Sequence, residues 1–296
     1  MPELPDVVVY IEALEQRIVG QPLEEYAILN PFILRTVTPP LDAAVGAAVR
    51  AVWRLGKRIV MEFDDELFLV IHLMIAGRFR WFDAGARKRL PGRISLAEFV
   101  FPTGALVLTE AGTTRRASLH VVRGRDALRE FDRGGLEVLQ ATRDEFADRL
   151  TSENHTLKRA LTDPRLFSGI GNAYSDELLH RARLSPLTLS SRLTGDEITR
   201  LFDAARRALT DWTQRLRDES RGRFPEKVTA FRDGMAVHGR FREPCPVCGT
   251  AVQRIRYAAN ETNYCPRCQT EGRVLADRAL SRLLKQDWPR TVEELS

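Results

Sequence analysis

The spacing of apolar residues along the 296-residue chain predicts a helix, then a set of strands, then a second group of helices. Near the start, Val8, Ile11, Leu14 and Ile18 recur every three or four positions. This spacing places them on one face of a helix, and Gly20 is a suitable end for it. The first segment is therefore predicted to be a single amphipathic helix.

From about residue 23 to residue 122, the pattern changes to short runs rich in β-branched and aromatic residues. Turn residues such as Asp64-Asp65 and Thr103-Gly104 separate the runs. The runs lie at residues 47–53, 58–63, 67–72, 79–82, 96–101 and 105–108. Consecutive strands without helices between them predict a β-sandwich or barrel.

Helical spacing returns after about residue 141 and predicts helices at residues 143–150, 156–161, 172–180 and 194–216. The loop before the third of these helices contains Gly169, Gly171 and Asn172. Glycines let backbone N–H groups approach a phosphate, the next helix offers its N-terminal dipole, and Asn172 can donate to the same group. Because a Gly-x-Gly turn between helices is common, an ordinary connection is the alternative.

All four cysteines lie within one short segment, in the spacing C-x2-C-x16-C-x2-C. Each pair can supply two thiolates to a tetrahedral zinc ion, and the segment between the pairs can form a β-hairpin. Two disulfides would also use every thiol, but disulfides are uncommon in a chain without a secretion signal. We therefore expect one structural Zn²⁺, bound by Cys245, Cys248, Cys265 and Cys268.

The formal net charge is +5, with an isoelectric point near 9.2. Positive charge is concentrated before and within the cysteine segment, where residues 221–256 carry eight basic residues against three acidic ones. A nucleic-acid partner would explain this concentration, and a solvated charged surface is the alternative. Because no apolar run approaches the ~18 residues of a membrane span and no secretory signal is visible, we expect a cytoplasmic protein without membrane contact.

The first six residues, Met1-Pro2-Glu3-Leu4-Pro5-Asp6, carry the most specific candidate chemistry. A small second residue favours removal of the initiator methionine, which would leave Pro2 with a free secondary amine. An α-amino group has a pKa of roughly 7.7–8.0, so a neutral, nucleophilic fraction exists near pH 7. Glu3 is the adjacent carboxyl, placed to exchange protons with the amine or a substrate. The alternative is that Pro2 and Pro5 only start the helix.

Three further places in the strand region are candidates for contact with a ligand. Lys57 lies at a strand junction, where its side chain could enter a groove or point to solvent. Ile75 lies in an apolar turn after a strand, and Arg115 and Arg116 end a polar loop. An enzyme that turns a base out of a duplex must fill the vacated stack, and an apolar tip with an arginine loop would serve. Ile75 could equally be ordinary core.

Four of these features occur in one order: Pro2-Glu3 at the terminus, Lys57 at a strand junction, the Gly-Ile-Gly-Asn hairpin and the four-cysteine segment. Together they resemble the formamidopyrimidine-DNA glycosylase / endonuclease VIII family of base-excision repair enzymes, over roughly residues 1–270. The resemblance implies an α+β multidomain fold. Its predicted parts are an N-terminal catalytic β-sandwich domain with one long helix (1–135), a helix-two-turns-helix DNA-binding domain (141–240), a four-cysteine zinc-finger β-hairpin (241–272) and a C-terminal extension without a family counterpart (273–296).

The resemblance implies a DNA glycosylase with AP lyase activity, whose partner is double-stranded DNA containing damaged bases or abasic sites. Pro2 would attack C1′ of the damaged nucleotide, and Glu3 would protonate the sugar oxygen. Loss of the base would be followed by β,δ-elimination through a Schiff base, without a redox cofactor or catalytic metal. We expect a monomer in the bacterial cytoplasm, associated with the nucleoid through DNA.

The family pattern also implies roles for residues at matching positions. Lys57 joins the catalytic group and matches a lysine that contacts the phosphate at the lesion. Lys158 and Asn172 resemble further phosphate contacts in the helical domain, beside the glycines of the hairpin. Asp6 stands where the family usually has glutamate, and Glu177 matches a family acid in the helix after the hairpin.

Three of the DNA-reading sites depart from the family pattern. A family arginine that grips phosphates is replaced by Asn260, although Arg254 or Arg256 on the same hairpin could take over its contact. The first wedge pattern, His-Leu-Gly-Met, reads His72-Leu73-Met74-Ile75 here, which places Ile75 at the void-filling position.

The second wedge has Arg115 and Arg116 followed by Ala117, without the usual aromatic residue. These departures leave the lesion preference and the preferred opposite base open. They also keep a different class in view, a catalytically weak family member that binds nicks, gaps or single strands. A zinc-ribbon regulator that binds DNA or RNA is a third class, but it would leave Pro2 and Glu3 unexplained.

Overall fold

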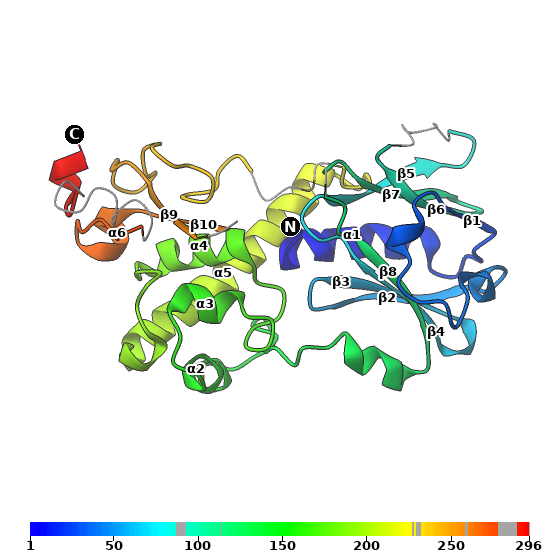
Figure 1. Ribbon diagram of the computed structural model, residues 1–296, viewed down its shortest axis with the longest axis horizontal. Helices are drawn as coiled ribbons and strands as arrows, with labels where there is room; N and C mark the ends of the chain where they lie inside the picture. The colour runs from blue at the N-terminus through cyan, green and yellow to red at the C-terminus, as the bar shows by residue number, and fades with distance from the viewer. Residues whose placement is uncertain are drawn as a thin grey trace. The chain divides into compact units, whose positions relative to one another are not determined.

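The computed structural model describes residues 1–86, 93–112, 114–226, 228, 232–257, 260–277 and 289–295 (Figure 1). The chain forms two compact units. The first comprises Met1–Arg133 and Trp212–Thr229, and the second comprises Gly134–Asp211 and Ala230–Ser296. The division of the second unit into a helical domain, a finger and an extension stays a prediction.

The predicted N-terminal helix is confirmed as α1, Leu4–Ile18. Pro5 lies in its first turn, where backbone N–H groups have no partner within the helix, so the missing N–H of proline costs no hydrogen bond. The Glu3 backbone N–H donates to Asp6 Oδ2 at 2.8 Å, so a carboxylate of the first turn satisfies a group at the helix start. The chain turns away at Gly20, whose φ of 80° suits glycine.

The strand region folds as a β-sandwich, as predicted. Within the described residues, one antiparallel sheet has the order β1-β6-β7-β5 and the other has the order β2-β3-β4-β8. Their bounds are β1 Glu25–Ile28, β2 Val49–Leu55, β3 Arg58–Phe63, β4 Leu67–His72, β5 Gly77–Asp83, β6 Ser95–Phe101, β7 Gly104–Glu110 and β8 Ser118–Arg123. Strands β1 and β8 were absent from the predicted runs. In Figure 1 the two sheets lie on either side of α1.

The sandwich core explains why β3 and β4 read as almost continuous apolar runs. Ile59 and Leu69 face the main core together with Leu14 of α1. Val60 and Val70 face the opposite side, where they pack with Phe131. Since both faces of these strands are buried, apolar residues occupy successive positions. The core therefore fixes α1, and with it the N-terminus, against the second sheet.

The second unit contains the predicted helices, α2 Arg143–Thr151, α3 Leu157–Thr162, α4 Asn172–Ala182 and α5 Gly195–Ser220, of which the last turns group with the first unit. Thr142 and Glu145 form a capping box at the start of α2. Phe146 packs its ring against Phe167 and Phe202, with centroids 4.9 and 5.4 Å away. These aromatic contacts hold the helices around the hairpin loop.

The predicted finger hairpin is present as β9 Gln253–Tyr257 and β10 Asn260–Tyr264, followed by α6 Pro266–Thr270. Short 3-10 turns lie at Pro31–Ile33, Leu41–Ala44, Asp64–Glu66, Arg125–Glu130, Ser190–Arg192 and Val292–Leu295. Apolar spacing in the extension suggests a short helix before Trp288, but residues 278–288 lie outside the described part and residues 273–277 are not helical. Among the described residues, no helix is long and apolar enough to cross a membrane.

Candidate functional site

The N-terminus is buried against the first unit. Pro2 is buried, and Glu3 is only 2% exposed. Burial is the main cause that lowers the pKa of the Met1 terminal amine, while the Glu3 carboxylate raises it. A lowered pKa increases the neutral, nucleophilic fraction of an amine near pH 7. The start of α1 thus holds an amine and a carboxyl together in a poorly solvated place.

Two cations and a second carboxylate complete the surroundings of this amine. Arg78 and Lys57 lower its pKa, and Asp6 raises it. Lys57 lies in the turn between β2 and β3, as predicted for a strand junction. Arg78 on β5 was missed, because a single arginine in a strand has no sequence signal. Its guanidinium donates to the carbonyl of Gly77 at 2.6 Å, which holds it near the turn before β5.

The first predicted wedge is the tight turn between β4 and β5. Ile75 is 56% exposed at this turn and is not part of the core. Met74 adopts φ 52°, in the left-handed region that favours glycine. The Gly77 N–H donates to the Leu73 carbonyl, and a Cβ on Gly77 would lie 2.2 Å from that oxygen. The turn therefore presents an exposed isoleucine on a constrained backbone.

Replacing Met74 by glycine is expected to stabilise the protein by about 1 kcal/mol, because glycine adopts positive φ without the Cβ clash. Chemical denaturation followed by circular dichroism measures the change. Met74→Ala is the matched control, since it removes the same side chain but keeps the Cβ. Equal stability of the glycine and alanine variants would show that the backbone at this turn is unstrained.

The second predicted wedge loop is held by Glu110, which is buried at the end of β7. Its carboxylate accepts hydrogen bonds from the backbone N–H groups of Arg116 and Ala117 at 3.0 and 3.1 Å. The Arg115 guanidinium donates to the Arg93 carbonyl. Both arginine side chains are exposed and Ala117 is buried. The loop thus offers positive charge at its surface, while the position after the arginines faces inward.

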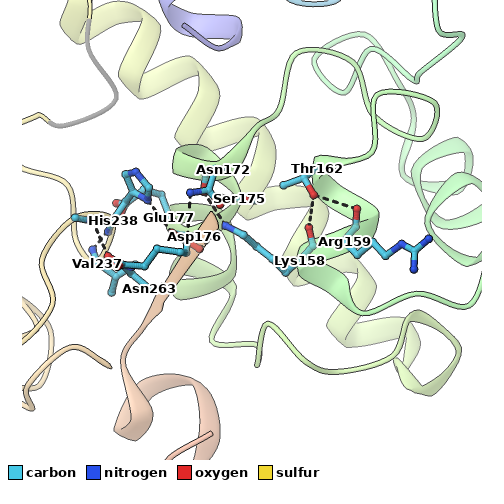
Figure 2. A network of polar contacts seen from close by, with 12 residues as sticks. Lys158, Arg159, Thr162, Asn172, Ser175, Asp176, Glu177, Val237, His238 and Asn263 are labelled. Atoms are coloured by element: carbon cyan, nitrogen blue, oxygen red, sulfur yellow. Dashed lines mark hydrogen bonds and ion pairs between the residues drawn. The ribbon is translucent and has the colours of Figure 1, made fainter. Parts of the chain in front are cut away.

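In the second unit, Lys158 is held by a buried carboxylate (Figure 2). Its Nζ donates to Asp176 Oδ1 at 2.5 Å and to the Asn172 carbonyl at 2.7 Å. The other Asp176 oxygen lies 2.8 Å from His238 Nδ1. An ammonium has three donors, and these two contacts use two of them. Asp176 and His238 were not foreseen, because 62 residues separate them in the sequence.

Helix α4 also organises the segment that leads into the finger. The Glu177 carboxylate accepts hydrogen bonds from the N–H groups of Ala236, Val237 and His238 at 2.7 to 2.9 Å. Asn172 Nδ2 donates to the Glu261 carbonyl on β10 at 2.9 Å. Asn172, for which a phosphate contact is predicted, thus contacts the finger hairpin within the protein. Gly169 has φ 78°, and Gly171 is the extended residue that precedes α4.

Glu261 on β10 binds the two arginines of β9. Arg254 Nη1 lies 3.1 Å from the Glu261 carboxylate, and Arg256 Nε lies 3.5 Å from it. Arg254 also stacks over the ring of Phe241, 4.1 Å from its centroid. Asn260 begins β10 opposite Tyr257, and its side chain lies outside the described part.

The four cysteines, all within the described ranges, are free thiols that converge at the base of the hairpin. The Sγ atoms of Cys248 and Cys265 are 3.4 Å apart, and those of Cys245 and Cys268 are 3.9 Å apart. Such a donor set fits one tetrahedral, closed Zn²⁺ site, and the chain has a structural zinc finger.

His180 on α4 joins this cluster and was missed by sequence reasoning. Its Nε2 lies 3.3 Å from Cys245 Sγ, within the same group of candidate ligands. A neutral imidazole can donate an N–H to a thiolate ligand and so fix its orientation. No spacing rule relates His180 to the cysteines, since 65 residues separate it from Cys245.

A β-sandwich, a helical region and a four-thiol finger make this chain a multidomain zinc-finger protein. Family models match in the same order: the formamidopyrimidine-DNA glycosylase N-terminal domain over residues 1–119, its H2TH domain over residues 136–217, and the zinc finger found in FPG and IleRS over residues 242–270. A formamidopyrimidine-DNA glycosylase of Heliobacterium modesticaldum is 31% identical over 281 residues, covering 91% of this chain and all (100%) of that relative. The chain belongs to the formamidopyrimidine-DNA glycosylase family.

Solved structures agree with this assignment. The MutM (Fpg) protein from Thermus thermophilus has a TM-score of 0.77 at 33% identity, covering 92% of this chain and 100% of that one. Lactococcus lactis Fpg, solved in complex with DNA containing an abasic site, has a TM-score of 0.79 at 25% identity, covering 90% and 99%. The α+β multidomain fold expected from the sequence is confirmed.

Proposed function

We propose that Pro2 is the nucleophile and Glu3 the proton donor of this chain. Family membership makes the chain a base-excision repair DNA glycosylase with AP lyase activity. The observation that supports the residue assignment is that Pro2 is buried directly beside the buried carboxyl of Glu3. Burial of an amine favours its neutral form. An amine that is neutral near pH 7 can attack a sugar carbon without first losing a proton.

The chemistry follows from these two groups. After removal of Met1, the Pro2 nitrogen attacks C1′, and the damaged base leaves with the bonding electron pair. Glu3 protonates the sugar oxygen as the ring opens, which yields an iminium between Pro2 and C1′. Abstraction of a C2′ proton then expels the 3′ phosphate, and a second elimination expels the 5′ phosphate. Water releases the sugar fragment and restores the amine.

Double-stranded DNA containing damaged bases or abasic sites is the partner. Lys57, Lys158 and the basic finger are proposed to neutralise phosphates, and Ile75 to fill the vacated stack. A Lactococcus lactis Fpg structure contains formamidopyrimidine-dG DNA, and we propose ring-opened or oxidised purines as the first substrates to test. We further propose that the chain acts as a monomer on chromosomal DNA in the cytoplasm.

Arg78→Gln is expected to move the acid side of the pH–rate profile to higher pH. Arg78 lowers the pKa of the Met1 amine. Pro2 is the next residue, so we expect the same charge to lower the pKa of the Pro2 amine once Met1 is removed. Loss of Arg78 would then raise that pKa and protonate the nucleophile at a higher pH. Single-turnover cleavage of an abasic duplex across pH measures the shift. Arg80→Gln, on the same strand, is the control and should keep the wild-type profile. An unchanged profile for Arg78→Gln would remove Arg78 from the account.

An incision panel tests the function itself. Duplexes carrying an abasic site, an oxidised guanine or an oxidised pyrimidine are incubated with wild-type protein and with Pro2→Gly. We expect cleavage of the abasic duplex and of at least one lesion duplex, with phosphate at both ends of the gap, as β,δ-elimination requires. Ala117 stands where the family usually has an aromatic residue, and this favours the alternative of a protein that binds nicks, gaps or single strands. Binding of these duplexes without any cleavage would support that alternative.

A further inference from the structure

We propose that the C-terminal extension positions Arg256 to contact a DNA phosphate, with Asp277 as the positioning residue. The proposal rests on the proposed DNA-binding function and goes beyond it, since the extension lies outside the three matched family domains. The two arginines of β9 differ in exposure and in their contacts.

Arg256 is the available arginine of the hairpin. Its side chain is 61% exposed, whereas that of Arg254 is 29% exposed. Arg254 is committed to the ring of Phe241 and to an ion pair with Glu261. Among the described residues, the Arg256 side chain makes only the longer, 3.5 Å contact with the same carboxylate. A guanidinium has five N–H donors, so Arg256 retains donors for a phosphate.

Asp277 holds the backbone of Arg256. Its Oδ2 accepts the Arg256 backbone N–H at 2.7 Å, and the residue is 2% exposed. Arg256 pairs with Glu261 in the described hairpin, and β9 has no further strand beside it there. The carboxylate therefore satisfies an N–H on the outer edge of β9. A buried carboxylate is costly without such partners, so this contact fixes both segments.

The extension is itself attached to the finger. The Leu275 N–H donates to the hydroxyl of Tyr264, a fully buried residue of β10, at 2.7 Å. The Val274 N–H donates to the Arg290 carbonyl at 2.8 Å, and the Val292 N–H donates to the Gly272 carbonyl at 2.9 Å. Asp277 thus follows a segment pinned on two sides. The last described part of the chain thus contacts the start of the extension, and Leu275 joins that start to the hairpin.

The partner of the Arg256 guanidinium is proposed to change when DNA binds. Without DNA, the Glu261 carboxylate partly neutralises Arg256. A phosphate would replace this carboxylate, while the contact of Asp277 with the Arg256 backbone keeps β9 in position. Asn260 carries no charge, so at this end of the hairpin the charge available to a phosphate is on β9.

The test uses the full-length zinc-loaded protein and a duplex with a non-cleavable abasic analogue. Affinity is measured against salt concentration. Arg256→Gln is expected to weaken binding about tenfold and to reduce the slope of log K against log salt by about one. Arg129→Gln is the control, because Arg129 is an exposed arginine (83%) that lies outside the finger and the extension. It should keep the wild-type slope.

Asp277→Ala should reproduce most of the Arg256→Gln loss, and the double variant should lose little more. Asp277→Asn should restore wild-type binding, because its amide oxygen still accepts the Arg256 N–H. Zinc content and melting temperature separate loss of positioning from loss of folding. If Asp277→Ala loses zinc, the proposal is judged from the DNA affinities of Asp277→Asn and Arg256→Gln instead.

A wild-type salt slope in Arg256→Gln, or additive losses in the double variant, would overturn the proposal. Failure of wild-type protein to bind the duplex would instead contradict the proposed function.

Discussion

Glu3→Gln is expected to lower the rate of base excision by roughly 10²- to 10⁴-fold, the usual contribution of a positioned general acid. The amide cannot protonate the sugar oxygen, although its size is the same. The backbone N–H of residue 3 still donates to Asp6, so the start of α1 should be preserved. Single-turnover kinetics on a lesion duplex measures the effect.

The matched control is Glu15→Gln, an exposed glutamate on the same helix. This variant should excise at the wild-type rate, and circular dichroism should show both variants folded. If Glu3→Gln excised at the wild-type rate, proton donation would have to come from another group.

Removal of zinc is the second large effect. Structural zinc contributes apparent binding free energies of about 10–16 kcal/mol in finger peptides, so the finger is expected to unfold without it. Unfolding of the hairpin breaks the contact between Arg256 and Glu261. It also breaks the contact between Glu261 and Asn172. DNA affinity should fall by at least ~10-fold, the value of one charge-assisted hydrogen bond.

The sandwich should stay folded during this treatment, because its core contains no residue of the finger. Near-ultraviolet circular dichroism of Trp53 and Trp81, both in the first unit, reports on it. Re-addition of zinc provides the control and should restore binding. Unchanged DNA affinity after proven loss of zinc would show that the finger does not contribute to recognition.

Local chemistry made parts of this site predictable from the sequence. Two C-x2-C turns are sufficient to bring four thiols together, and Pro2 and Glu3 are neighbours in the chain. Helix α1 and strands β2 to β7 followed from their runs of apolar residues, because these residues are buried in the sandwich. Strands β1 and β8 did not. The order of these motifs, more than any one of them, indicated the family.

Tertiary contacts explain what the sequence did not reveal. Asp176, His238 and His180 act through partners about 60 residues away, so no local spacing marks them. Arg78 reaches the terminal amine only because β5 packs near the start of α1. Asp277 lies in an extension that resembles nothing in the family pattern, and its contact with Arg256 depends on how that extension folds back on the finger.

Met74 is different, because its departure from the family glycine was visible in the sequence. Its consequence was not visible, since the left-handed backbone at this turn is a property of the fold. Methionine in place of glycine at position 74 therefore changes the side chain and also raises the free-energy cost of the left-handed backbone at this turn.

Borohydride trapping shows directly whether Pro2 is the nucleophile. Purified protein is incubated with an abasic duplex and sodium borohydride, and the adduct is digested and mapped by mass spectrometry. We expect a covalent DNA adduct on the amine of Pro2, in a chain that has lost Met1. An adduct on Lys57 or another lysine, or no adduct on a duplex that the protein binds, would contradict Pro2 as the nucleophile.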